Sequence, residues 1–254
     1  MSPFKEPRFF AYDPADPAHT SENGLSFPIR TLADYSAQFS EVTAEKAIGE
    51  ASPHYMISPV APANIRQVIP DVRLIFSLRH PVKRAYSVYW HQVRLGNEPR
   101  SIEQAFTEQD HRVRNGRYYA LLLPWFDLFD ASQIKVILFE DLIREPLVVL
   151  DELYRFLGVQ TGFVPDLIIR NKGGAMKNER LGRILEKVKT HPIRQALDPY
   201  LPSRLRTLAA DVRNNNFADT PPMPQAVEKQ LYDYYREDIA QLEQLLQRDL
   251  SLWK

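Results

Sequence analysis

The stretch at 71–92 constrains the fold most, because it predicts a strand followed at once by a helix. Residues 72–78 are apolar and partly β-branched, which is typical of a strand buried in a parallel sheet. Pro81 suits the first turn of a helix, where a missing N–H costs no hydrogen bond. Arg79 and His80 are therefore expected at the carboxyl end of the strand, where open α/β sheets bind their ligands.

This strand-to-helix turn predicts an anion site. A guanidinium can fork onto a phosphate with two hydrogen bonds, and a helix N-terminus favours negative charge. Ser87, two turns into the predicted helix, adds a hydroxyl donor. The alternative is that Arg79 is a surface arginine paired to a carboxylate and that Ser87 is a solvated helix residue. Both interpretations stay open on the spacing alone.

Strands and helices alternate along much of the chain. Leu32 and Leu147 are predicted to face the core from helices that begin after Thr31 and at Pro146. The alternation predicts an α/β fold with a three-layer parallel sheet flanked by helices, in a single domain at 1–254. Further strands are predicted at 47–50 and 134–139, and further helices at 62–69, 121–129 and 225–246.

Composition excludes several classes of site. The 254 residues contain no cysteine, which excludes disulfides, a thiol nucleophile and cysteine-type zinc sites. Lysine plus arginine equals aspartate plus glutamate at 32 each, so we predict no nucleic-acid partner. No apolar run approaches the length of a membrane span and no ligand cluster for a metal is visible. We therefore predict no membrane segment, no metal and a cytoplasmic location, and the oligomeric state stays open.

Six motifs in order along the chain carry a resemblance to a known family. In these segments the chain resembles the sulfotransferases that use 3′-phosphoadenosine 5′-phosphosulfate (PAPS), especially bacterial and heparan-sulfate-type members. The resemblance implies a P-loop NTPase-like sulfotransferase fold with PAPS as co-substrate. The motifs are Lys-Glu-Pro-Arg-Phe-Phe at 5–10, Gly-Glu-Ala-Ser-Pro-His-Tyr at 49–55, Leu-Arg-His-Pro-Val-Lys-Arg-Ala-Tyr-Ser at 78–87, Phe-Glu-Asp-Leu at 139–142, Phe-Leu-Gly-Val at 156–159 and Arg-Asp-Leu-Ser-Leu-Trp at 248–253.

The resemblance assigns a donor site. It implies that Arg79 and Ser87 hold the 3′-phosphate of the donor and that Tyr118 belongs to the nucleotide pocket. It also implies that a late loop closes over the 3′-phosphate. The residues of that loop are Lys172, Gly173 and Gly174.

The resemblance also assigns an acceptor site. Glu6 matches the carboxylate that takes the proton from the acceptor hydroxyl in heparan-sulfate-type members, and His54 is the second candidate base. Lys5 and Arg8 are expected beside the acceptor, and the alternative for His54 is a loop histidine without a role. Some relatives have a lysine at the position of Ala51, so this motif departs from that subclass.

A larger departure concerns the 5′-phosphosulfate. The family carries a loop of the type Pro-Lys-x-Gly-Thr-Thr after its first strand, and the 254 residues contain no such sequence. N-terminal truncation is the favoured explanation, and degeneration is the alternative. Either one predicts that the first strand is missing and that sulfuryl transfer by these residues is weak or absent.

The leading functional prediction is an enzyme that moves a sulfuryl group from PAPS to a hydroxyl or amine of a small-molecule or glycan acceptor. The missing loop motivates an alternative, a non-catalytic nucleotide-binding module of the same ancestry. A small-molecule kinase with a related core is a third candidate, which the lack of a phosphate loop disfavours.

Overall fold

A computed structural model describes residues 2–20, 27–165, 175–176, 217–218 and 220–254. The chain divides into two compact units. The first comprises Met1–Arg79, Arg117–Pro165 and Asp238–Leu252, and the second comprises His80–Gly116, Asp166–Glu237 and Trp253–Lys254. The single domain at 1–254 stays a prediction. The predicted loop at 172–174 lies outside the described residues.

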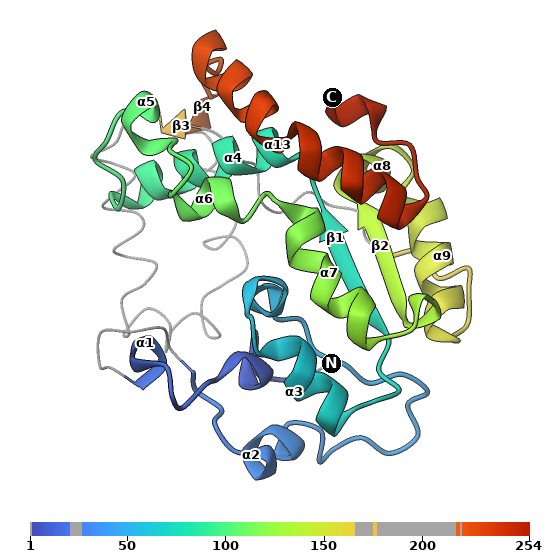
Figure 1. The fold of residues 1–254 in the computed structure, drawn as a ribbon. Helices are drawn as coiled ribbons and strands as arrows, with labels where there is room; N and C mark the ends of the chain where they lie inside the picture. The colour runs from blue at the N-terminus through green and yellow to red at the C-terminus, as the bar shows by residue number, and fades with distance from the viewer. Residues whose placement is uncertain (1, 21–26, 166–174, 177–216, 219) are drawn as a thin grey trace, which may run out of the picture. The chain divides into compact units, whose positions relative to one another are not determined.

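A parallel pair of strands forms the centre of the first unit. β1 (Leu74–Leu78) pairs with β2 (Ile134–Leu138), in a register that runs from Leu74 opposite Ile134 to Leu78 opposite Leu138. Both strands are apolar runs of the kind that parallel sheets bury, which explains why the sequence identified them. In the described part of the unit these two strands are the whole sheet (Figure 1).

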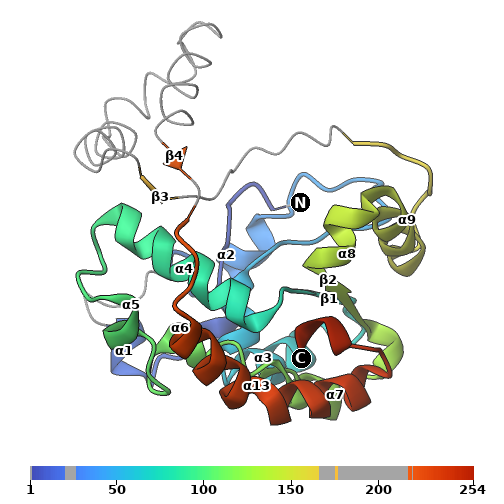
Figure 2. The same cartoon turned by 90° about the horizontal axis from the view of Figure 1, so that it is seen from above.

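Helices cover the strand pair of the first unit on both sides. α7 (Tyr118–Leu128) lies on one side, whereas α8 (Phe139–Arg144) and α9 (Pro146–Leu157) lie on the other (Figure 2). Phe76 of β1 meets Trp125 of α7 edge to face, with ring centroids 5.1 Å apart. The predicted three-layer α/β arrangement is therefore confirmed.

An aromatic cluster holds the N-terminal part of the first unit. Phe10 is 3% exposed, and its ring centroid lies 4.9 Å from Tyr35 and 5.9 Å from Tyr55. Apolar rings of this size supply much of the burial that loop-rich segments need. The elements here are η1 (Phe9–Ala11), α1 (Pro17–Thr20), α2 (Leu32–Ala37), η2 (Pro53–Ile57), α3 (Ala61–Val68) and η3 (Ala131–Gln133).

The second unit is built around two long helices. α4 (Pro81–Leu95) begins at Pro81, as predicted, and stops at Gly96, whose φ of 76° suits glycine. α13 (Gln225–Leu246) supplies its residues up to Glu237 to this unit and the remainder to the first. Among the helices described, none is both long and apolar enough to span a bilayer. The other elements are α5 (Ile102–Ala105), α6 (His111–Arg114), β3 (Ala175–Met176), β4 (Phe217–Ala218) and η5 (Ser251–Trp253), which ends at the unit boundary.

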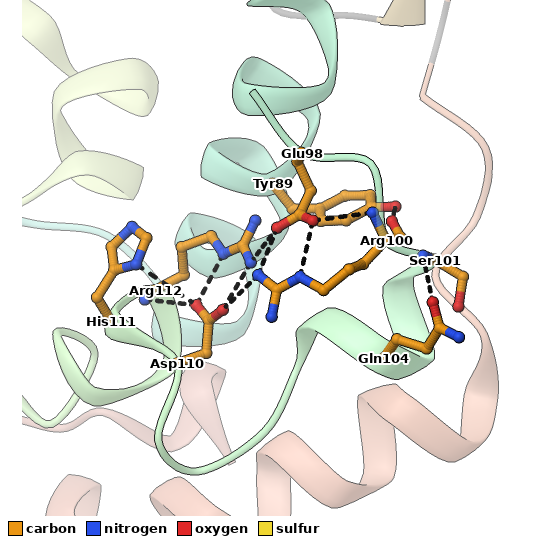
Figure 3. A network of polar contacts seen from close by, with 8 residues as sticks. All are labelled: Tyr89, Glu98, Arg100, Ser101, Gln104, Asp110, His111 and Arg112. Carbon is orange, nitrogen blue, oxygen red and sulfur yellow. Dashed lines mark hydrogen bonds and ion pairs between the residues drawn. The ribbon is translucent and has the colours of Figure 1, made fainter. Parts of the chain in front are cut away.

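A buried ionic network ties the segment after α4 together (Figure 3). Arg112 is 1% exposed and donates to Glu98 at 2.6 Å and to Asp110 at 2.6 and 2.8 Å. Arg100 donates to Glu98 from the solvent side, at 2.7 and 2.9 Å. These hydrogen bonds from Arg100 and Arg112 lower the pKa of Glu98 to about 2, so its carboxylate is charged at neutral pH. The network thereby satisfies two carboxylates whose side chains are only 4% exposed.

Three local predictions were wrong. Residues 47–50 form no strand, because the described chain there has no neighbouring strand to pair with, and Gly49 accepts from the Ser2 N–H instead. Leu32 is 50% exposed, because the short α2 buries only Tyr35. Leu147 is 46% exposed, since α9 turns Val149 rather than Leu147 toward the interior.

Gly158 ends α9 in the left-handed region, and replacing it by alanine is expected to destabilise the protein. Its φ is 71°, and an added Cβ would lie 3.0 Å from Nη1 of Arg73. The conformational cost for a residue with a Cβ is about 1–2 kcal/mol. Urea unfolding of Gly158→Ala measures it, with Gly49→Ala as control because Gly49 has no positive φ and no atom within 4 Å of the added Cβ. Equal free energies of unfolding for the two variants would contradict the prediction.

Candidate functional site

Arg79 follows the last residue of β1, and its side chain is half-buried. The guanidinium lies over the ring of Phe139, 5.2 Å from its centroid, where β2 passes into α8. Within the described residues no carboxylate pairs with this guanidinium. In the described part of the chain, the alternative of a carboxylate-paired surface arginine is therefore not observed.

Tyr118 fixes the backbone of the same arginine. It is the first residue of α7 and is 1% exposed, and its hydroxyl donates to the carbonyl oxygen of Arg79 at 2.8 Å. The structure thus brings together two of the residues that the resemblance assigns to the nucleotide, within one unit. This hydrogen bond from the Tyr118 hydroxyl holds the main chain at Arg79 and leaves the Arg79 guanidinium out of the contact.

Glu6 and Arg8 lie in a strained turn of the first unit. Both have left-handed backbone, with φ of 55° and 56°, although neither is glycine. The residue before a proline normally adopts extended backbone, and Glu6 precedes the buried Pro7. Nη2 of Arg8 lies 3.0 Å from Oε2 of Glu6, and each side chain is 30% exposed. Strain of this kind persists only where the surroundings hold it, and it is common at functional sites.

Two side chains from other segments hold this turn. Ser52 accepts from the Arg8 N–H at 3.1 Å and donates to Glu50 at 2.8 Å. Asn64 of α3 donates to the carbonyl of Phe10 at 2.9 Å. Burial raises the pKa of Glu50, although the hydrogen bond from Ser52 opposes the rise. The roles of Ser52 and Asn64 could not be predicted from the sequence, because their partners are distant in the sequence.

His54 lies in η2, close enough to the strained turn to feel its charges. Burial lowers the pKa of His54, and the charges of Arg8 and His19 lower it further, while Glu6 opposes them. A neutral imidazole can accept a proton. The structure therefore brings both candidate bases, Glu6 and His54, into one region together with Arg8.

The remaining predicted site residues are not brought into a described arrangement. Lys5 is exposed in the N-terminal segment and contacts no polar partner in the described structure. Ser87 is exposed on α4, which belongs to the second unit, so its pairing with Arg79 stays a prediction. His80 is buried in the second unit, where its Nε2 lies 3.1 Å from the hydroxyl of Tyr232. In the described part of the chain, no three histidine, aspartate or glutamate side chains are grouped to hold a metal ion.

Comparison with known proteins matches the chain to one family. A family model described as "Sulfotransferase domain" matches residues 23–195. The matched range contains His54, Arg79, Ser87 and Tyr118 but not Glu6. The crystal structure of a sulfotransferase from Alicyclobacillus acidocaldarius has a TM-score of 0.68 and 27% sequence identity, and the alignment covers 99% of this chain and 87% of that chain.

Curated relatives match over shorter ranges. The bifunctional heparan sulfate N-deacetylase/N-sulfotransferase 1 of Xenopus laevis is 31% identical over 125 residues, which is 43% of this chain and 14% of that protein. The bifunctional heparan sulfate N-deacetylase/N-sulfotransferase 3 of Homo sapiens is 30% identical over 171 residues, which is 61% of this chain and 18% of that protein. The alignments thus span less than a fifth of the length of these two relatives.

Proposed function

Because this chain belongs to the sulfotransferase domain family, we propose that it moves a sulfuryl group from PAPS to a hydroxyl or amine acceptor. The observation that carries the proposal is the Arg79 guanidinium. It is half-buried at the carboxyl end of β1, lies over the ring of Phe139 and has no carboxylate partner among the described residues. These are the properties of a cation kept for a phosphate, and the 3′-phosphate of PAPS is the group proposed for it. Ser87, Lys172, Gly173 and Gly174 are proposed to complete the donor site.

The proposed chemistry needs a base and a leaving-group site. Glu6 takes the proton from the acceptor, the acceptor atom forms a bond to sulfur, and the bond between sulfur and the 5′-phosphate oxygen breaks. The products are the sulfated acceptor and adenosine 3′,5′-bisphosphate. Arg8 holds the Glu6 carboxylate at 3.0 Å, and His54 is the second candidate base. No step requires a metal ion.

A glycan or small molecule is the proposed acceptor. The relatives described above are named heparan sulfate N-sulfotransferases, which favours an amine or hydroxyl on a sugar. Lys5 and Arg8 lie in the segment proposed to meet it, and both are positively charged. The family match favours sulfuryl transfer over the kinase alternative.

Arg79→Ala is expected to weaken binding of adenosine 3′,5′-bisphosphate by about 10- to 100-fold, the worth of a hydrogen bond to a charged group. Isothermal titration calorimetry measures the affinity. Arg155→Ala is the matched control, because Arg155 is an arginine of the same unit whose side chain is 65% exposed and paired to Asp151. Equal affinities for Arg79→Ala and the unaltered chain would remove Arg79 from the donor site.

A non-catalytic nucleotide-binding module is the second candidate function, and the lack of a Pro-Lys-x-Gly-Thr-Thr sequence favours it. The two candidates differ in turnover. Incubation with ³⁵S-labelled PAPS and a panel of amino sugars and hydroxyl acceptors would detect label transfer. Bisphosphate binding without label transfer supports the module, whereas transfer that depends on Glu6 supports the enzyme.

A further inference from the structure

Asp238 is a buried carboxylate that neither the motifs nor the family match explains. It lies on α13 and is 2% exposed. Its Oδ2 accepts from the N–H of Tyr119 at 3.0 Å, and its Oδ1 accepts from the N–H of Ala120 at 3.3 Å. Arg117 lies 3.8 Å from Oδ1. All these residues belong to the first unit, so a side chain from the C-terminal helix caps the first turn of α7.

The capped turn is the one that carries Tyr118. The first N–H groups of a helix have no partner within the helix, and a carboxylate placed there satisfies them and favours the helix dipole. Tyr118 donates its hydroxyl to the carbonyl of Arg79 at 2.8 Å. Asp238 is therefore connected to the turn that bears Arg79. It accepts from the N–H of Tyr119, a peptide bond joins Tyr119 to Tyr118, and the Tyr118 hydroxyl donates to the Arg79 carbonyl.

We infer that Asp238 is a positioning residue for the anion site at Arg79. It fixes the start of α7, and α7 fixes the Arg79 backbone through Tyr118. This inference rests on the proposed function of Arg79 as the ligand of the 3′-phosphate. Asp238 itself does not touch the nucleotide, since both of its oxygens face the α7 backbone.

The burial of Asp238 indicates that this cap does more than stabilise α7. Burial raises the pKa of Asp238, although the N–H donors of Tyr119 and Ala120 and the charge of Arg117 oppose the rise. A buried carboxylate is costly, and an exposed serine or threonine directly before a helix can cap it without that cost. Residue 117, which occupies the N-cap position of α7, is an arginine that makes no side-chain cap. The helix start is therefore held by a distant element, which couples it to α13.

The test is the selectivity for a 3′-phosphate. Calorimetry would measure the affinities for adenosine 3′,5′-bisphosphate and for adenosine 5′-monophosphate. The affinity for the bisphosphate divided by that for the monophosphate isolates the contribution of the 3′-phosphate contact. Asp238→Asn keeps one oxygen acceptor and the shape, but it loses the charge and places an amide against one N–H. We expect the ratio to fall about five- to tenfold, with the affinity for the monophosphate unchanged. Asp233→Asn is the control, because Asp233 is a half-exposed aspartate of the same helix.

An unchanged ratio would overturn the inference, whether both affinities stay the same or both fall by an equal factor, because Asp238 would then have only a structural role. Asp238→Ala is expected to lower the ratio further. Its thermal unfolding without nucleotide separates a folded variant from an unfolded one, and a folded alanine variant with an unaltered ratio also contradicts the inference.

The double variant separates this inference from the proposed function. If Arg79 holds the 3′-phosphate, adding Asp238→Asn to Arg79→Ala lowers the ratio no further, because both act on one contact. If Arg79→Ala leaves the ratio unchanged, Arg79 does not belong to the donor site, and the inference about Asp238 is wrong as well. A ratio that falls with Arg79→Ala but not with Asp238→Asn removes Asp238 alone.

Discussion

Replacing Arg112 by leucine is expected to lower the free energy of unfolding by about 3 kcal/mol or more, because it removes the buried donor that two buried carboxylates share. Glu98 and Asp110 have side chains that are 4% exposed, and Arg112 is the residue that bonds both of them at 2.6 Å. The same guanidinium lies 5.5 Å from the ring of Tyr89 and 5.9 Å from that of Phe106. Leucine retains some apolar contact but no donor.

Urea unfolding would measure the loss, with Arg100→Leu as the matched control. Arg100 bonds the same Glu98, but its side chain is 48% exposed, so its removal is expected to destabilise the protein less than removal of Arg112 does. Water can replace Arg100 at the outer side of the network, whereas it cannot reach the inner side. A loss for Arg112→Leu no larger than that for Arg100→Leu would contradict the prediction.

Replacing Glu6 by glutamine is expected to slow sulfuryl transfer by about 10²- to 10⁴-fold, the usual contribution of a general base. Glutamine keeps an oxygen that can accept from Arg8 in place of the ion pair at 3.0 Å, so the strained turn can persist, but it does not take a proton. Single-turnover transfer of ³⁵S from labelled PAPS is the measurement, because we expect slow turnover from a chain in which no 5′-phosphosulfate loop is recognised.

Two further variants make this test specific. His54→Gln removes the other candidate base, and a larger loss for His54→Gln than for Glu6→Gln would exchange their roles. Glu41→Gln is the control, since Glu41 is an exposed acid of the same unit. Bisphosphate affinity should be the same in all three variants, because none of them lies in the proposed donor site.

The elements that the sequence predicted correctly are those with strong local patterns. β1 and β2 are short apolar runs, α4 begins at a proline, and α9 ends at a glycine with positive φ. The predicted helix at 225–246 has the observed bounds, because its apolar stripe persists over many turns. The prediction of a strand at 47–50 failed because a strand needs a partner, and four residues carry no information about one.

The motifs predicted Arg79, Tyr118, Glu6 and His54 as candidate site residues. The structure adds the contacts that hold them. Asp238 could have been suspected, because it lies on the apolar face of α13, three residues after the buried Tyr235 and four before the buried Leu242. A carboxylate on such a face signals a buried polar partner. Its partner, however, lies 119 residues away in the chain.

The sequence by itself thus determined where the two central strands and the long described helices lie, and its motifs proposed which residues carry the family's chemistry. Local propensity and short motifs suffice for this, since they act between near neighbours. Only the tertiary structure decided that Ser52 holds the strained turn at Arg8, that Arg112 joins two buried carboxylates, and that Asp238 caps α7. Each is a polar contact in a buried place, and such contacts are set by which segments the fold brings together rather than by any local pattern.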